Sequence, residues 1–151
     1  CPKNESWKPN DWYAKPNEPI ATVIELMDSL AKDFPIDTTR KYVMGLSMGG
    51  YGTWYLITRY PNTYAAAVPI CGGGDWNQAH VLTHIPLWVF HGKKDEIVLP
   101  EQSRKMVKAI KKAGGKPRYT EYKKAGHDSW TPALKEPELL PWMFGKSLSH
   151  D

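Results

Sequence analysis

The sequence is poor in cysteine and has no long apolar run, and each absence narrows what the protein can be. Its two cysteines, Cys1 and Cys71, lie in neither a CxxC pair nor a Cys/His ligand spacing, so we expect no metal site there. Two cysteines do not define a disulfide framework, and a single bond between them stays open. No stretch approaches the ~18 apolar residues of a membrane span, which predicts no membrane partner.

The excess of positive over negative charge is small. The formal net charge is +4 at pH 7, and much of the positive charge falls in one stretch of the chain. The basic residues of that stretch are Arg104, Lys105, Lys108, Lys111, Lys112, Lys116, Arg118, Lys123 and Lys124. Because most of them fall on the polar side of an expected helix and the following strand, we interpret them as a solvated face and expect no nucleic-acid partner.

Nothing in the composition divides the chain. At 151 residues it is expected to form a single domain over residues 1–151, without repeats, low-complexity tracts or linkers. Residues 1–6 have neither the basic nor the apolar region of a signal peptide, although this does not fix a compartment.

Short apolar runs alternate with amphipathic helical patterns along the chain. Apolar runs typical of buried strands occupy residues 42–44, 65–70 and 85–90, and residues 118–122 are also interpreted as a strand. Helical spacing predicts helices at residues 17–34, 49–59, 75–82 and 100–113, with further helical pieces between 130 and 144. The alternation predicts an α/β fold, a parallel sheet of about four strands with helices on both faces.

A G-x-S-x-G motif, Gly45-Leu46-Ser47-Met48-Gly49, joins the first expected strand to the helix after it. A sharp turn there would lift the Ser47 hydroxyl above the sheet, where it can act as a nucleophile. The backbone N–H of Met48, at the start of the helix, would face a developing oxyanion. We expect glycine at both flanks because a Cβ at Gly45 or Gly49 would collide with the neighbouring strand or helix.

A serine nucleophile needs a base, and the base needs an acid that orients it. Candidates for both follow later strands, in the order serine, acid, histidine. Asp95 comes after the strand at 85–90, and His127 comes after the strand at 118–122. Because ligand sites gather at the carboxyl ends of parallel strands, we expect Ser47, Asp95 and His127 to meet there as a catalytic triad.

Other residues offer weaker versions of these roles. Glu96 and Asp128 remain open as the acid, although Asp128 adjoins the base in sequence and would point elsewhere. His91 precedes Gly92 as in an oxyanion loop, but it follows a late strand, so we interpret it as a packed strand-end residue. The other histidines, without a zinc-protease motif, are interpreted as surface residues: His80, His84 and His150.

Two tryptophans are candidates for substrate contact. Trp76 follows the glycine-rich loop at 72–74, and Trp130 comes three residues after His127. An aromatic ring at either position suits stacking on a sugar or phenyl ring of a substrate. Packing beneath loops is the competing interpretation for both residues.

Four stretches together resemble the esterase branch of the α/β-hydrolase superfamily, which includes feruloyl esterases, acetyl xylan esterases and polyhydroxybutyrate depolymerase-like enzymes. They are GLSMGGYGTW (45–54), PICGGGD (69–75), HGKKD (91–95) and GHDSW (126–130). The resemblance implies Ser47, Asp95 and His127 as the triad, with no metal and no organic cofactor. It also implies small-molecule ester substrates, such as plant cell-wall esters, and a secreted or periplasmic location.

From the motifs and the resemblance we predict a serine carboxylesterase that hydrolyses short-chain acyl, aryl or feruloyl esters through an acyl-enzyme. A serine peptidase of the prolyl-oligopeptidase kind shares the triad order and stays open. It is less favoured because no added domain that would close a peptide site is visible between Ile70 and Ile85. A non-catalytic hydrolase half-domain that binds a partner is the third hypothesis.

The resemblance extends only over the carboxyl half of the hydrolase fold. Family members begin with several strands and a His-Gly loop that supplies the second oxyanion donor, and nothing in this chain corresponds to them. We therefore expect the second donor to lie outside this chain. We also expect an N-terminal segment or a second chain to pair with the strand that ends at Gly45, whose apolar edge would otherwise be exposed.

Overall fold

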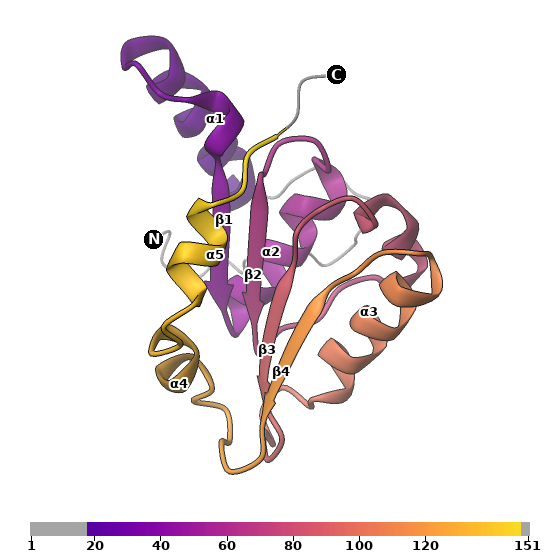
Figure 1. Cartoon of the computed structure of the whole chain (residues 1–151). Coiled ribbons are helices and arrows are strands. Elements are labelled where there is room, and N and C mark those ends of the chain that lie inside the picture. The colour runs from indigo at the N-terminus through magenta and orange to yellow at the C-terminus, as the bar shows by residue number, and fades with distance from the viewer. Residues whose placement is uncertain (1–17, 149–151) are drawn as a thin grey trace.

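The structure, a computed structural model, describes residues 18–148 and is built around one parallel sheet (Figure 1). Its strands follow the order β1-β2-β3-β4 and comprise Tyr42–Leu46, Ala66–Ile70, Trp88–Gly92 and Arg118–Tyr122. All neighbouring pairs are parallel. The predicted α/β class and the parallel four-stranded sheet are confirmed.

The third strand begins later than its apolar run suggests. β3 starts at Trp88, preceded only by an isolated bridge between Leu87 and Ala67. Pro86 accounts for the difference, because proline has no N–H to donate to a ladder. The Pro86 carbonyl still accepts the N–H of Ala67, at 3.0 Å.

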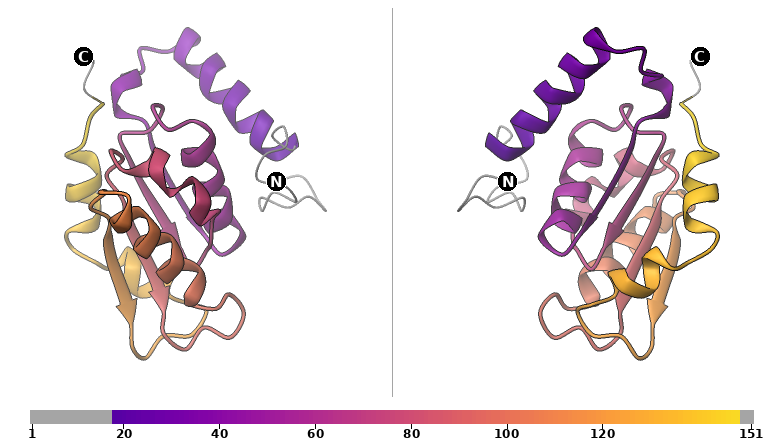
Figure 2. Two further views of the ribbon diagram at one scale, coloured as in Figure 1. Left: turned by 90° about the vertical axis from the view of Figure 1, so that its right-hand side faces the viewer. Right: turned by 90° about the vertical axis from the view of Figure 1, so that its left-hand side faces the viewer.

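Helices cover both faces of the sheet (Figure 2). One face carries α2 (Met48–Arg59), the 3-10 helix η2 (Trp76–Leu82) and α3 (Glu101–Lys112), and the other carries α4 (Trp130–Leu134) and α5 (Leu139–Phe144). A short 3-10 helix, η1 (Thr38–Arg40), leads from α1 (Glu18–Asp33) into β1. None of the described helices is both long and apolar enough to cross a membrane.

Successive residues of the central strands enter two separate cores. Val89 packs with Trp54 beneath α2 and α3, whereas Val68 and Phe90 pack with Met143 beneath α4 and α5. Every residue of β2 and β3 is buried. Burial on both faces explains why these strands are continuous apolar runs in the sequence rather than alternating patterns.

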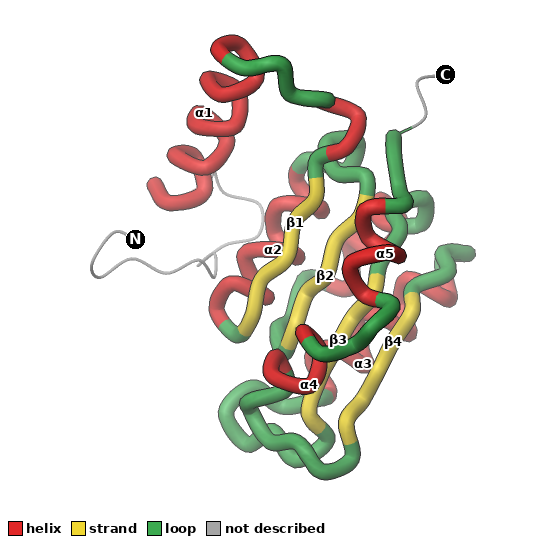
Figure 3. The backbone as a smooth tube through the Cα atoms, turned by 60° about the vertical axis from the view of Figure 1, so that its left-hand side comes forward, coloured by secondary structure: helices red, strands yellow, loops and turns green. Residues whose placement is uncertain are grey.

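β1 lies at the edge of the sheet. Within the residues that the structure describes, β1 pairs only with β2, and Met44 and Leu46 are each 41% exposed. α1 stands beside this edge (Figure 3) and packs Ile20 into the core while Leu26 and Leu30 remain exposed. Apolar surface thus collects on this side of the molecule.

The glycines around the turn after β1 differ in what they allow. A Cβ on Gly45 would collide with the carbonyl of Gly49 and lie 2.7 Å from Thr53 Oγ1, as predicted. The same expectation for Gly49 is wrong, because a Cβ there comes within 4 Å of no atom in a neighbouring described strand or helix. Gly50 is the second constrained position, since its Cβ would collide with the carbonyl of Ile70 on β2.

We predict that Gly45→Ala lowers the free energy of unfolding by about 1–3 kcal/mol or more, the usual cost of overpacking. Gly49→Ala is the matched control, and it should leave stability unchanged or slightly higher because alanine favours a helix over glycine. Urea unfolding followed by circular dichroism measures both. Equal losses in the two variants would contradict this explanation of the turn.

Candidate active site

Ser47 occupies the tight turn between β1 and α2 with a backbone conformation that is rare for a residue with a side chain. Its φ is 53° and its ψ is −116°. The Ser47 N–H donates to the carbonyl of Ile70 at 2.9 Å, and the Ser47 carbonyl accepts the N–H of Tyr51 at 3.1 Å. These two bonds anchor the turn to β2 and to α2, at the carboxyl end of the sheet.

The three residues predicted from separate parts of the sequence lie together at this end. Ser47 Oγ lies 2.8 Å from His127 Nε2, and His127 Nδ1 lies 2.8 Å from Asp95 Oδ2. Asp95 is on the loop after β3 and His127 is on the loop after β4. The arrangement is a continuous chain of hydrogen bonds from carboxylate to imidazole to hydroxyl.

Asp95 is held rigidly and is fully buried, whereas 22% of the His127 side chain is exposed. Oδ1 of Asp95 accepts the backbone N–H groups of Ile97 and Val98, both at 2.9 Å. Burial acts to raise the pKa of Asp95, but the hydrogen bonds from His127, Val98 and Ile97 outweigh it and hold the pKa below its usual value. The ionised carboxylate orients His127 with Nδ1–H toward it, which leaves Nε2 to accept a proton from Ser47.

The two alternative acids lie elsewhere. The carboxylate of Asp128 accepts the N–H of Thr131 at 3.1 Å and its hydroxyl at 3.0 Å, within the first turn of α4. Glu96 is exposed on the loop after β3. Neither has a described contact with the imidazole of His127.

His91 lies buried directly behind Asp95. Its Nε2 is 2.8 Å from the carbonyl of Val98 and 3.3 Å from Asp95 Oδ2, and its Nδ1 is 2.7 Å from Ser103 Oγ. Burial lowers the pKa of His91 despite the acceptors on Val98 and Asp95. The interpretation of His91 as a packed strand-end residue is confirmed, but the sequence does not predict its contact with Asp95.

Cys71 is a neighbour of the site that sequence reasoning missed. It is fully buried at the end of β2 with φ at 40°, and its Sγ lies 3.3 Å from the backbone nitrogen of Ser47. Burial raises the pKa of the thiol. Cys71 is a free cysteine, and its suggested disulfide partner, Cys1, lies outside the described residues.

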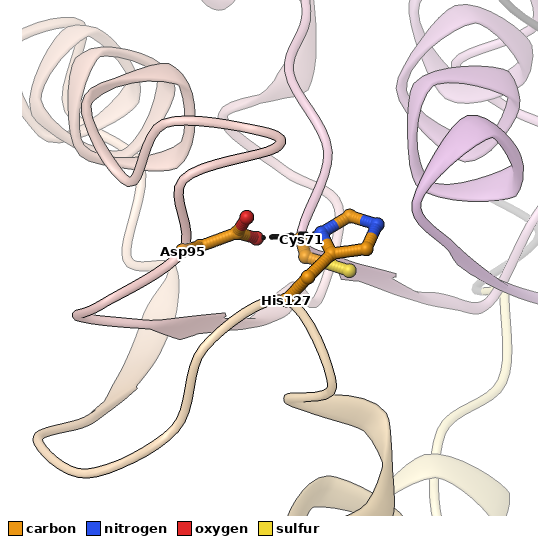
Figure 4. A group of neighbouring side chains, drawn as sticks. All are labelled: Cys71, Asp95 and His127. Atoms are coloured by element: carbon orange, nitrogen blue, oxygen red, sulfur yellow. Dashed lines mark hydrogen bonds and ion pairs between the residues drawn. The ribbon is translucent and has the colours of Figure 1, made fainter.

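Within residues 18–148, one group of side chains could converge on a metal ion. The ligand atoms of Cys71, Asp95 and His127 lie within 4.8 Å of one another (Figure 4). A zinc site requires its donors to surround one point at ~2.0–2.3 Å. Here Asp95 and His127 bond directly to each other and the second ring nitrogen faces Ser47, which suits proton transfer better than metal ligation.

A cavity of about 530 Å³ lies beside Ser47. Of the two candidate tryptophans, only Trp130 has a described contact with the triad. The cavity runs along residues 44–49, with Ile70 and Leu134 on its wall. Trp130 packs edge-on against the His127 ring, with centroids 5.4 Å apart. Trp76 does not line this cavity; it lies at the start of η2, where Lys105 Nζ is 4.8 Å from its ring centroid.

Comparisons with known proteins agree with this arrangement. The profile of the prolyl oligopeptidase family matches residues 3–89 and 78–141. The crystal structure of a thermostable esterase superposes with a TM-score of 0.92 and 43% sequence identity, over 97% of this chain and 42% of the esterase. The chain therefore spans less than half the length of that relative.

Two curated relatives are similar over shorter stretches. A bifunctional acetylxylan esterase/xylanase of Neocallimastix patriciarum is 28% identical over 91 residues, which are 60% of this chain and 14% of the relative. Poly(3-hydroxyalkanoate) depolymerase C of Paucimonas lemoignei is 36% identical over 52 residues, which are 34% of this chain and 13% of the relative.

Proposed function

Because the chain belongs to the prolyl oligopeptidase family and has the α/β-hydrolase fold, we propose that it carries the catalytic residues of a serine carboxylesterase. The substrates would be short-chain acyl, aryl or feruloyl esters. The hydrogen-bonded chain from Ser47 Oγ through His127 to Asp95, with both links at 2.8 Å, is the observation that carries the proposal. Similarity to a thermostable esterase and to an acetylxylan esterase supports esters as the substrate class.

The proposed reaction proceeds through an acyl-enzyme. His127 Nε2 removes the proton of Ser47 Oγ as the oxygen attacks the ester carbonyl carbon. The tetrahedral intermediate collapses, the C–O bond to the alcohol breaks, and the alcohol leaves with the proton from His127. Water then attacks the acyl-Ser47 carbonyl while His127 takes its proton, the bond from the acyl carbon to Ser47 Oγ breaks, and His127 returns the proton to Oγ as the acid leaves. Asp95 stabilises the imidazolium in both halves, so these steps require no cofactor.

Backbone donors would stabilise the oxyanion. The N–H of Met48 begins α2, where the helix dipole favours negative charge, and Met48 lines the cavity beside Ser47. We expect the second donor to come from a segment outside the described residues. Loss of one such donor typically lowers kcat by about 10²–10³, so the full rate depends on the segment that supplies the other.

We place that segment along the outer side of β1. The edge strand exposes Met44 and Leu46, and the thermostable esterase superposes closely while being more than twice as long as the matched region. A strand paired there would cover the apolar edge. It would also bring new backbone N–H groups beside Ser47, whether it comes from the same polypeptide or from a second chain.

Hydrogen exchange of the β1 amides, measured in the intact protein together with any second chain that binds it, tests this placement. Pairing on both sides should slow exchange at every amide of Tyr42–Leu46. The inner strand β2 provides the reference for full protection. Fast exchange at alternate β1 amides, beside slow exchange throughout β2, would show an open edge and contradict the placement.

The two other hypotheses have less support than the esterase. A peptidase shares this family and the same triad order, but the connection from β2 to β3 consists of a glycine-rich loop and η2, with no added domain that would enclose a peptide. A non-catalytic half-domain would have no need for a serine held at φ 53° against a histidine. Failure of Ser47 to react with a fluorophosphonate in a folded sample would favour that hypothesis.

We predict that Ser47→Ala abolishes hydrolysis of p-nitrophenyl acetate and that Asp95→Asn lowers kcat by about 10⁴-fold, the loss that the same change causes in the triad of a serine protease. The physical reason for the second effect is that an amide holds the imidazole in the wrong tautomer. Glu96→Gln and Asp128→Asn remove nearby carboxylates without changing side-chain size and should leave kcat near the wild-type value. A large loss in either control, with Asp95→Asn active, would assign the acid to that residue instead.

We predict a preference for acetyl to butyryl or feruloyl esters over long-chain lipids. Trp130 beside His127 can stack on an aromatic or sugar group, and within residues 18–148 no segment forms a lid over the cavity at Ser47. A panel of aryl, feruloyl, acetyl-sugar and lipid esters, with a proline-containing dipeptide amide, measures kcat/KM. Rates that keep rising beyond about eight acyl carbons, at the roughly 0.8 kcal/mol gained per buried CH₂, would contradict the prediction. Faster cleavage of the amide would establish the peptidase.

A further inference from the structure

A second groove, separate from the cavity at Ser47, lies between η2 and α3. These two helices cover the same face of the sheet as α2 (Figure 2). It encloses about 670 Å³. Its walls carry Trp76 and His80 from η2 and three lysines from α3, Lys105, Lys108 and Lys112. None of these residues lines the cavity at Ser47.

Trp76 presents an exposed aromatic surface in this groove. Its exposed fraction is 44%, whereas Trp54 and Trp88 are almost fully buried. Lys105 places its ammonium group over the Trp76 ring, 4.8 Å from the centroid, in a cation–π contact with one face of the indole. An exposed indole in a concave surface is a platform for a flat or sugar-like ring, and the adjacent ammonium can pair with an acidic group on that ring.

The lysines form a row along one face of α3. They are spaced three and four residues apart, so their side chains share one side of the helix, and Lys105 and Lys112 are about 10 Å apart along its axis. Among the described residues, no aspartate or glutamate lines the groove. The acid of the first turn of α3, Glu101, pairs with Arg104, which also pairs with Glu121.

We propose that this groove binds an acidic glycan, an oligosaccharide that contains uronic acids. A sugar ring stacks on Trp76, and successive carboxylates pair with Lys105, Lys108 and Lys112. A neutral sugar would contact only the Trp76 ring, and an inorganic anion would contact only the lysines. Only an oligosaccharide that has both sugar rings and carboxylates uses the whole groove. The glycan would carry the ester that the active site hydrolyses, and this part of the inference rests on the proposed function. Binding of the glycan in the groove requires no catalysis.

Calorimetric titration of the full chain tests the proposal, with Ser47→Ala as the background so that no turnover occurs. The probes are an oligogalacturonate and a neutral xylo-oligosaccharide of the same length. We expect the acidic oligomer to bind at least tenfold more tightly, by about 1.4 kcal/mol or more, and to weaken as salt increases. Trp76→Ala should weaken both probes by roughly two- to tenfold, the range for aromatic contacts.

The lysines are tested by a matched pair of triple variants. Changing Lys105, Lys108 and Lys112 to alanine should remove the preference for the acidic oligomer. Changing Lys111, Lys116 and Lys124, exposed lysines outside the groove, alters the net charge equally and should keep that preference. Equal losses in the two triple variants would show a general charge effect and overturn the proposal.

Three further results would overturn it: no binding of the acidic oligomer, unchanged binding in Trp76→Ala, or displacement of the oligomer by inorganic phosphate as effectively as by free oligomer. The last would reduce the groove to a simple anion site. Ester hydrolysis by the wild-type chain is measured separately. Hydrolysis without glycan binding would contradict this proposal alone, and glycan binding without hydrolysis would contradict the proposed function alone.

Discussion

The backbone of Ser47 is held at φ 53°, a conformation that costs a serine about 1–3 kcal/mol, and the arrangement of the site depends on it. The N–H of Ser47 bonds to Ile70 on β2, and its carbonyl bonds to Tyr51 in α2. Gly45 and Gly50 let the chain turn this sharply, because a Cβ on either would collide with backbone. The packing of α2 on β1 and β2 thus maintains the strain, and the strained turn brings the hydroxyl to His127.

Burial decreases from Asp95 to His127. Asp95 is fully buried and accepts two backbone N–H groups, with His91 packed behind it, while His127 is partly exposed. A carboxylate whose position and charge are fixed can orient the imidazole, which in the proposed reaction takes and gives a proton in each half. The loop after β3 therefore supplies both the Asp95 carboxylate and the backbone N–H groups that hold it in place.

Signals that are local in sequence predicted much of this structure. β2 and β3 appear as apolar runs because they are buried on both faces, and Ser47, Asp95 and His127 each follow a strand at its carboxyl end. These features depend on a few consecutive residues and on the parallel direction of the sheet. The later start of β3, at Trp88, reflects Pro86 within an otherwise apolar run.

Features that depend on close approach between distant segments were not predictable. Cys71 lies 24 residues from Ser47 in sequence yet reaches its backbone nitrogen, and no local pattern marks that contact. The need for glycine at position 50 rather than 49 follows from the path of β2. The position of Trp76 after a glycine-rich loop suggests a place near the site, whereas η2 directs it to the groove with α3.

The central claim is that Ser47 itself becomes acylated, and trapping that intermediate tests it most directly. The full chain is mixed with excess p-nitrophenyl acetate, quenched in acid during turnover and mapped by peptide mass spectrometry. We predict one acetyl group on the peptide that contains Ser47, and none in the His127→Ala variant. Acetylation of the neighbouring thiol of Cys71 instead, or an active enzyme that carries no acyl group on Ser47, would contradict the claim.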